Sequence, residues 1–221
     1  MEKIKKHDFI EIEYTGIVKE SNLVFDTTDN KIAKENNLHS HDNYSPVIIC
    51  VGEEQVLKGI DKNLEGKEVG NEYNFVIKPE DGFGNKNAQL IQLIPTNKFR
   101  QQNLQPMPGM QLNIDGMLGT VKTVSGGRTL VDFNHPLAGK ELSYKVKINR
   151  KITDDKEKVT GILTLSLGTK DFNVEINENS IEVVLKLDLS REAKGDLSKK
   201  ILKLIPTLKK IEFKVEKNKN K

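Results

Sequence analysis

Apolar residues between positions 51 and 84 recur first at helical spacing and then at every second position. Val56, Ile60 and Leu64 fall on one helix face, which predicts a short amphipathic helix that begins near Glu53 and ends at Gly66. Carboxylates in a first turn suit the positive end of the helix dipole, and glycine permits the left-handed backbone common at helix ends. Residues 73–77 alternate apolar and polar positions, which is typical of a strand with one buried face.

Alternation also runs through the residues before this segment. Residues 9–18, FIEIEYTGIV, predict an antiparallel strand with one solvated face, and residues 24–28 predict a short second strand. Residues 46–51 form an apolar, β-branched run that predicts a strand leading into the helix. Residues 29–45 are polar and rich in asparagine, so we expect a surface loop with one helical turn at residues 32–36.

The pattern becomes irregular in residues 86–133, here called the insert. Glycines separate short predicted strands at residues 120–124 and 129–133, and residues 95–100 predict a short helix. So small a segment cannot bury all its apolar residues, and we expect part of this set to form an exposed binding surface. The set is Leu90, Ile91, Leu93, Ile94, Phe99, Met107, Met110, Met117 and Leu118. Methionines adapt to different apolar partners, although they also fill gaps in irregular cores, and both interpretations remain open.

The last part of the chain predicts a separate small domain over residues 154–221. The charged residues 154–158 are interpreted as a linker, and residues 162–167, 172–176 and 181–189 as three strands. A helix then runs to Ile205, before Pro206, and residues 208–215 form a last strand. This β-β-β-α-β domain has a marginal core, so we expect it to pack against a second copy, giving a homodimer, or against the neighbouring domain.

Composition narrows the class of protein. The chain has 221 residues, of which 30% are charged, and a formal net charge of +3. It contains no long apolar run, so we expect no membrane span and no signal peptide. Arginine and aromatic residues do not cluster, which argues against a nucleic-acid partner. The single cysteine, Cys50, allows no disulfide within the chain and suits a reducing cytoplasm.

Several short segments carry a resemblance to a known family. They are YTG at residues 14–16, Phe25-Asp26, QVLKGI at 55–60, LEGKEVG at 64–70 and DGFG at 81–84. In this order they resemble the FKBP-type peptidyl-prolyl isomerases. Residues 134–146 are similar to the closing strand of the SlyD-like members of that family, and the insert resembles their insert-in-flap module.

The resemblance implies an α+β fold in which a curved antiparallel sheet wraps on a short helix and carries a small β-rich inserted domain. It implies an isomerase domain at residues 1–85 plus 134–153, an inserted chaperone domain at 86–133 and a C-terminal domain at 154–221. It also implies peptidyl-prolyl cis-trans isomerase activity without a cofactor. The partners would be unfolded or proline-containing polypeptides, captured by the insert.

Family likeness further implies a proline pocket. Its residues would be Tyr14, Phe25, Asp26, Val47, Val56, Leu57, Ile60, Phe83, Leu137 and Tyr144. The Tyr14 hydroxyl would reach Asp26, and the Leu57 backbone N–H would bind the substrate carbonyl. Many relatives carry aromatic residues where this chain has Val47 and Ile49, and some carry tryptophan at the position of Ile60, so we expect a shallower wall.

Two other functions remain open at this point. One is a holdase chaperone whose pocket has weak isomerase activity, because pocket aromatics are missing. The other is a metal-binding SlyD-like protein that uses His39, His41 and His135, with Asp42 near the first two. Residues 155–221 contain no histidine and no cysteine, so the metal-binding tail of bacterial SlyD proteins is absent.

Overall fold

The computed structural model describes residues 2–38, 44–177 and 179–216. Contacts divide the chain into two compact units, which are described separately. The first comprises Met1–Ile77 and Leu142–Lys221, and the second comprises Lys78–Glu141. No helix among the described residues is both long and apolar enough to cross a membrane.

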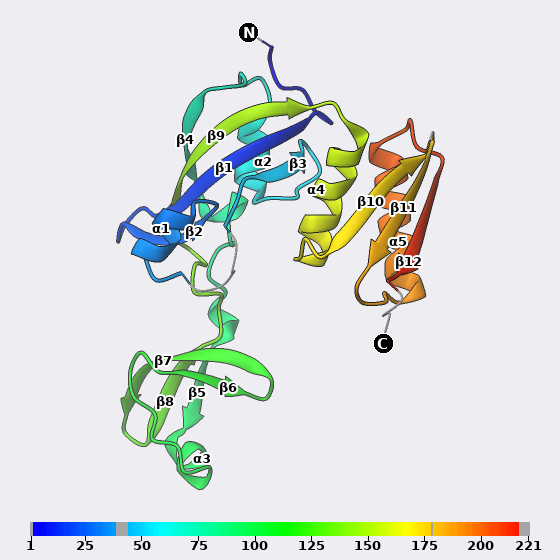
Figure 1. Cartoon of the computed structure of the whole chain (residues 1–221). Coiled ribbons are helices and arrows are strands. Elements are labelled where there is room, and N and C mark those ends of the chain that lie inside the picture. The colour runs from blue at the N-terminus through cyan, green and yellow to red at the C-terminus, as the bar shows by residue number, and fades with distance from the viewer. Residues whose placement is uncertain (1, 39–43, 178, 217–221) are drawn as a thin grey trace. The chain divides into compact units, whose positions relative to one another are not determined.

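A curved antiparallel sheet forms the first part of the first unit (Figure 1). Its strands are β1 (Phe9–Val18), β2 (Leu23–Thr27), β3 (Val47–Cys50), β4 (Glu72–Ile77) and β9 (Leu142–Ile152). One edge of β1 pairs with β9 along its whole length, while the other pairs first with β3 and then with β2. The helix α2 (Lys58–Leu64) buries Ile60 and Leu64 and packs against β4. The mixed α+β fold therefore has the antiparallel sheet and short helix that the resemblance implies.

The start of α2 corrects one prediction. The helix begins at Lys58 instead of near Glu53, because the preceding residues are held in a turn. The buried Asp61 carboxylate accepts hydrogen bonds from the backbone N–H groups of Gly52 and Glu54, each at 2.8 Å. Glu54 itself has a φ of +49°, which is incompatible with a right-handed helix. The acidic residue near the helix start is thus Asp61, and Glu53 and Glu54 precede the helix.

The loop after β2 contains the helical turn that the sequence predicts. It is α1 (Asn30–Glu35), and the Asp29 side chain caps it by accepting from the backbone N–H groups of Lys31 and Ile32. This N-cap explains why so polar a segment begins with regular structure.

The second unit is a four-stranded antiparallel sheet with one short helix. Its strands are β5 (Ile91–Pro95), β6 (Gln111–Ile114), β7 (Met117–Ser125) and β8 (Arg128–Asp132), in the order β5-β8-β7-β6. The helix is α3 (Thr96–Gln101), and two single turns, η1 (Pro79–Asp81) and η2 (Ala88–Leu90), precede β5. Its small core consists of Phe99, Leu112, Val121 and Val131.

The C-terminal residues correct a second prediction. Their order is α4 (Asp155–Leu167), β10 (Phe172–Asn177), β11 (Ser180–Leu185), α5 (Arg191–Leu204) and β12 (Lys210–Val215). The region is therefore α-β-β-α-β, and the predicted β-β-β-α-β order is wrong. Residues 154–158 are not a linker, because Asp154 caps α4 by accepting from the Glu157 backbone N–H at 2.8 Å. Gly168, at a φ of +66°, ends the helix.

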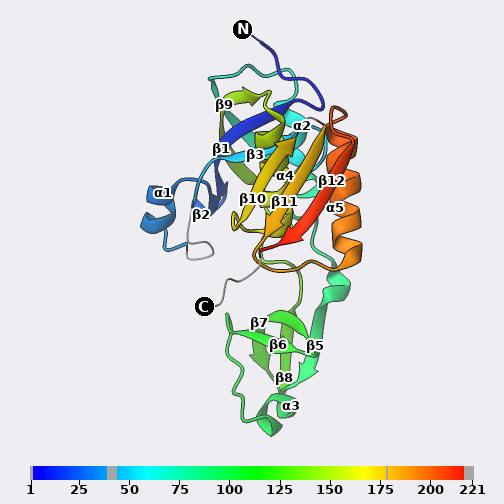
Figure 2. The ribbon, with the colours of Figure 1, turned by 45° about the vertical axis from the view of Figure 1, so that its right-hand side comes forward.

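Helix α4 joins the C-terminal strands to the first sheet. Its buried Val159, Ile162 and Leu163 share one hydrophobic core with Phe9 of β1 and Cys50 of β3. The same core contains α5 and the apolar face of the sheet β10-β11-β12, which is shown in Figure 2. Of the two packing modes that the sequence leaves open, the structure shows contact with the neighbouring sheet.

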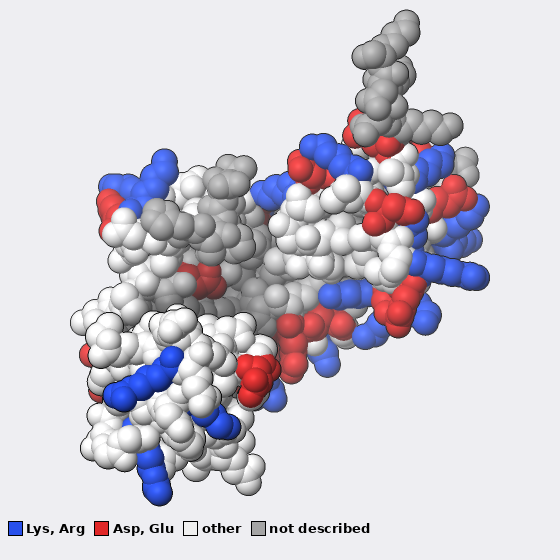
Figure 3. Space-filling view, turned by 90° about the horizontal axis from the view of Figure 1, so that it is seen from below, with Lys and Arg blue, Asp and Glu red and all other residues white. Residues whose placement is uncertain are grey.

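Charged side chains of both signs lie next to one another on the face shown in Figure 3. Within the C-terminal sheet the Lys214 ammonium lies 2.6 Å from the Glu182 carboxylate, and just outside its strands Lys186 lies 3.0 Å from Asp171. The polar face of this sheet is therefore a solvated surface of paired charges.

Candidate active site

A cavity of about 390 Å³ opens on the first unit, where β1, β2, β3 and β9 meet the residues around the start of α2. Seven of the predicted pocket residues line it: Tyr14, Asp26, Val47, Val56, Leu57, Ile60 and Tyr144. Glu54, Gln55, Lys58 and Leu165 complete the lining. The walls are mainly aliphatic and aromatic, and such a surface suits a small apolar ring.

Strand register explains how the aromatic wall forms. Gly16 of β1 pairs with Asp26 on one side and with Tyr144 on the other. A Cβ atom at Gly16 would lie 2.8 Å from the Tyr144 ring and 2.9 Å from the Phe25 ring, so only glycine leaves these rings their space. The ring centroids of Phe25 and Tyr144 are 5.8 Å apart in an edge-on arrangement, and those of Tyr14 and Tyr144 are 5.9 Å apart. Phe25 thus contacts the site through Tyr144.

The polar centre of the cavity is Tyr14 with Asp26. Burial, the charge of Asp26 and a hydrogen bond with its carboxylate raise the pKa of Tyr14 well above its usual value. Burial together with Asp26 and Tyr14 likewise raises the pKa of Tyr144. Both hydroxyls therefore keep their protons at neutral pH, and the Tyr14 hydroxyl can donate to Asp26. The predicted contact between Tyr14 and Asp26 is present.

Gln55 is a site residue that sequence reasoning missed. Its side-chain oxygen accepts a hydrogen bond from the Cys50 backbone N–H at 2.6 Å, which ties the segment carrying Val56 and Leu57 to β3. Its Nε2 is buried, with no partner among the described residues. Only the resemblance at residues 55–60 signals this position, because a lone glutamine in a turn has no distinctive pattern.

Leu165 of α4 is the second residue that was missed. It lies in the wall that also contains Val47, where the sequence predicts a shallow side. The mistaken assignment of residues 162–167 to a strand of a separate domain concealed this contribution. Ile49, the other residue of the predicted shallow wall, is buried in the core of the first unit and does not line the cavity.

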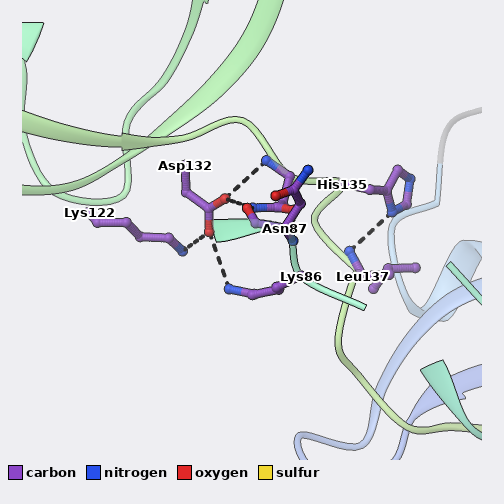
Figure 4. A network of polar contacts seen from close by, with 7 residues as sticks. Lys86, Asn87, Lys122, Asp132, His135 and Leu137 are labelled. Atoms are coloured by element: carbon purple, nitrogen blue, oxygen red, sulfur yellow. Dashed lines mark hydrogen bonds and ion pairs between the residues drawn. The ribbon is translucent and has the colours of Figure 1, made fainter. Parts of the chain in front are cut away.

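Phe83 and Leu137 belong to the second unit, so their place in the pocket stays a prediction. Within that unit the Phe83 ring stacks on the His135 ring with centroids 4.5 Å apart. The Leu137 backbone N–H donates to Nδ1 of His135 at 3.2 Å, as Figure 4 shows. Stacking and hydrogen bond together fix the residues that follow β8.

A buried carboxylate ties together the two chain segments at the base of the second unit (Figure 4). Asp132 accepts hydrogen bonds from Lys86 Nζ at 3.2 Å and from Asn134 Nδ2 at 2.8 Å, and the Lys122 ammonium lies 3.8 Å away. Burial alone would raise the pKa of Asp132, but hydrogen bonds from Asn134 and Lys86 outweigh it, and the pKa is lowered. Asn134 also bonds the backbone of Asn87, so entry and exit strands are joined.

The apolar residues of the insert divide into two groups. Phe99 is buried, and Ile94 and Met110 pack against the same core, whereas Leu90 is half-buried. The exposed members are Ile91, Leu93, Met107, Met117 and Leu118. Val124, which is not in the predicted set, is exposed as well. A groove of about 480 Å³ is lined by Ile94, Phe99, Ile114, Met117 and Phe133, among others. Met110 therefore helps to fill the core of the insert, whereas Met107 and Met117 lie exposed on its surface.

Residues 39–43 lie outside the described part of the chain, and with them the suggested metal ligands His39, His41 and Asp42. Among the residues that are described, no three His, Cys, Asp or Glu side chains are grouped so as to hold a metal ion.

Fold and site together define a class: an antiparallel sheet wrapped on a short helix, with a mainly apolar cavity that contains the Tyr14–Asp26 pair. A family model described as FKBP-type peptidyl-prolyl cis-trans isomerase matches residues 1–99. A second, described as FKBP26, IF domain, matches residues 92–137.

Individual relatives agree with the family models. The short-type peptidyl-prolyl cis-trans isomerase of Methanocaldococcus jannaschii is 34% identical over 146 residues, which cover 66% of this chain and 92% of the relative. The probable FKBP-type 16 kDa peptidyl-prolyl cis-trans isomerase of Pseudomonas fluorescens is 34% identical over 109 residues, which cover 47% of this chain and 71% of the relative. The FKBP-type peptidyl-prolyl cis-trans isomerase SlyD of Haemophilus influenzae is 28% identical over 150 residues, which cover 66% of this chain and 71% of the relative. The chain belongs to the FKBP-type peptidyl-prolyl cis-trans isomerase family and is SlyD-like.

Proposed function

We propose that this isomerase acts on X-Pro bonds of unfolded polypeptides, with the proline ring in the cavity of the first unit and the client chain on the insert. The observation that carries the proposal is the apolar cavity around the Tyr14–Asp26 pair. The cavity suits an uncharged ring, and the Tyr14–Asp26 pair in its wall would contact the amide next to that ring.

Isomerisation needs no nucleophile. Rotation about an X-Pro bond is opposed by a barrier of about 18–20 kcal/mol, because the C–N bond has partial double-bond character. Resonance is lost in the twisted transition state, which is less polar than the planar amide. A cavity that excludes water therefore favours the twisted state. A thousandfold acceleration requires about 4 kcal/mol of such preferential stabilisation.

Each part of the site has a role in this mechanism. Ile60, Val56 and Tyr144 would surround the proline ring and exclude water. The Leu57 backbone N–H, at the entrance to α2, would bind a substrate carbonyl. Asp26, held by the Tyr14 hydroxyl, would supply an ordered polar contact near the rotating bond. Phe83 and Leu137 are assigned to the rim of the pocket by family resemblance.

The insert is proposed as the chaperone domain, residues 86–133. Its exposed side chains, including Leu93, Met107 and Met117, offer apolar surface to an unfolded chain. Flexible thioethers repack around different partners at low cost, which suits clients of varied sequence. A client held there is tethered to the same chain as the cavity, so its prolines are presented at a high effective concentration. The clients would be unfolded or proline-containing polypeptides.

Two further proposals concern assembly and location. A homodimer through the C-terminal residues is supported by the sheet β10-β11-β12, because its outer strands each have an edge that a second copy can pair with. The cytoplasm is supported by the buried free thiol of Cys50, whose pKa is raised by burial to about 12.

Turnover of a short proline peptide tests the proposed site. We expect the intact protein to accelerate isomerisation and Asp26→Ala to lower kcat/KM by about 10–100-fold, the effect of losing a charged hydrogen bond. Phe83→Ala should also lower it, with circular dichroism confirming that both variants fold. Full activity in both folded variants would remove these pocket assignments. Absent turnover in the intact protein would favour a holdase.

A further inference from the structure

A second groove adjoins the proline cavity. Its volume is about 500 Å³, and it runs between β3 and helix α4. Four residues line both spaces: Tyr14, Asp26, Val47 and Leu165. The two spaces are therefore parts of one continuous depression on the first unit, and the far wall of the groove belongs to the C-terminal region.

Close packing of α4 on β3 fixes the width of the groove. Gly161 faces β3, and a Cβ atom there would lie 2.7 Å from Cβ of Ile48. Behind this contact, Val159, Ile162 and Leu163 are buried in the core shared with Phe9. Helix and strand lie next to each other in Figure 2. The groove is thus bounded by elements that share a core, and its walls are preformed.

The lining of the groove suits a polypeptide. Pro46, Ile48 and Leu165 supply apolar surface, and Thr160 and Thr164 add hydroxyls one helical turn apart. The Thr160 hydroxyl donates to the Lys156 carbonyl at 2.7 Å, which leaves its oxygen able to accept. Besides Asp26, two charged residues line the groove, and both have partners: Glu11 with Arg150 at 3.1 Å, and Lys170 with Ser45 at 2.6 Å. Apolar walls with scattered hydroxyls fit the side chains and amides of an extended peptide.

We propose that this groove binds the residues of the client chain that flank the proline on one side, so that α4 selects substrates. The inference rests on the proposed function, since the occupant is defined by a proline in the neighbouring cavity. A proline within a polypeptide continues covalently in both directions, and its neighbours must cross the adjoining surface. The groove that shares Val47 and Leu165 with the cavity is the surface they meet. Substrate preference next to proline then depends on a helix outside the isomerase sheet.

A filling substitution tests the groove. Thr164→Phe places a ring in it, and Ser166→Phe, on the exposed side of the same helix, is the matched control. Each is assayed on a proline tetrapeptide and on peptides extended before or after the proline. We expect Thr164→Phe to lower the ratio of kcat/KM between one extended peptide and the tetrapeptide by about tenfold, as the loss of one buried side-chain contact predicts. Ser166→Phe should leave both values unchanged. An unchanged ratio in Thr164→Phe overturns the proposal.

Thiol labelling gives a second measurement that does not depend on turnover. Cys50 is fully buried, so an added cysteine is the accessible thiol of the chain. A saturating extended peptide should slow labelling of Thr164→Cys by about tenfold, while the tetrapeptide and the Ser166→Cys control show no protection. Labelling at the same rate with and without extended peptide overturns the proposal. Protection without any turnover of the tetrapeptide would instead contradict the proposed isomerase function and leave the groove as a peptide site.

Discussion

The cavity of the first unit and the exposed surface of the second unit differ in construction, and their proposed functions make opposite demands on recognition. The cavity is built from residues fixed by neighbours: Tyr144 is 1% exposed, and Gly16 leaves space for its ring. The surface of the second unit exposes Met107 to 61% and Leu118 to 56%, over a core of only four buried residues. Chemistry on one bond requires fixed geometry, whereas capture of varied chains requires side chains that adapt. The difference predicts that the two regions respond differently to mutation.

Replacement of residues 86–133 by a short loop should have the largest effect, because it should change catalysis of protein refolding but not turnover of a short peptide. We expect the rate of a proline-limited protein refolding reaction to fall by about 100-fold, because the client is no longer tethered to the protein that carries the cavity. Turnover of a proline tetrapeptide should be retained, because a tetrapeptide needs only the cavity. Refolding kinetics and a peptide assay on the same preparation measure both. Two unchanged rates would show that the second unit has a structural role only.

A smaller effect is expected from removing the exposed apolar side chains alone. The triple change of Met107, Met117 and Leu118 to serine should reduce catalysis of protein refolding by about tenfold, since each buried apolar side chain contributes about 1.5–3 kcal/mol at most. The control changes Asn97, Gln101 and Gln111, which are exposed and polar, to serine. Equal rates for the two triple variants would contradict the proposed client surface.

The fixed geometry of the cavity is tested at Gly16. Gly16→Ala should lower the free energy of unfolding by about 1–3 kcal/mol, because its Cβ overlaps the rings of Tyr144 and Phe25. Gly195→Ala, in α5 and in open space, should raise it by about 0.5–1 kcal/mol. Urea denaturation measures both. Tolerance of alanine at Gly16 would mean that the aromatic wall moves freely.

The smallest predicted effect concerns pH and the base of the second unit. The pKa of Asp132 is lower in the folded protein, so its charge stabilises the fold at any pH above the ordinary value of about 3.9. That contribution is lost as pH falls through the folded pKa. The stability advantage of the native protein over Asp132→Asn should therefore be full at neutral pH and shrink below about pH 4. Thermal unfolding across this range measures it, with the exposed Asp115→Asn as control. A difference independent of pH would show that charge is not the cause.

The local pattern of apolar and polar residues predicts much of the first sheet. It does not predict the elements whose structure depends on long-range contacts. Alternation at residues 9–18 correctly indicates β1, and the β-branched run before Val51 indicates β3. The predicted helix start near Glu53 is wrong, because periodicity does not reveal the hydrogen bond that the Gly52 backbone N–H donates to the buried Asp61 carboxylate nine residues later. Taken alone, the alternating apolar and polar residues at 162–167 indicate a strand. Together with Val159 it belongs to a helix, which the contact with Phe9 stabilises.

The candidate site was predictable to the extent that family resemblance covers it. The resemblance located Tyr14, Asp26 and Ile60, because the segments that carry them match the family pattern. Leu165 could not be found in this way, since it lies in a region outside that resemblance and reaches the cavity only through tertiary packing. Gln55 lies inside the matched segment, but its role depends on a hydrogen bond to Cys50 that only the structure shows.

Pairing of β1 with β9 has a consequence for how the protein itself is made. Glu11 and Arg150, which form an ion pair across these strands, are 139 positions apart. The catalytic sheet therefore has a high contact order and cannot close until β9 has left the ribosome, whereas all the strands of the second unit lie between Ile91 and Asp132. Domains fold as units in the order of synthesis. The second unit should thus fold before β9 is available to pair with β1. The first unfolded chain available to the exposed apolar surface of the second unit is therefore the rest of this same protein.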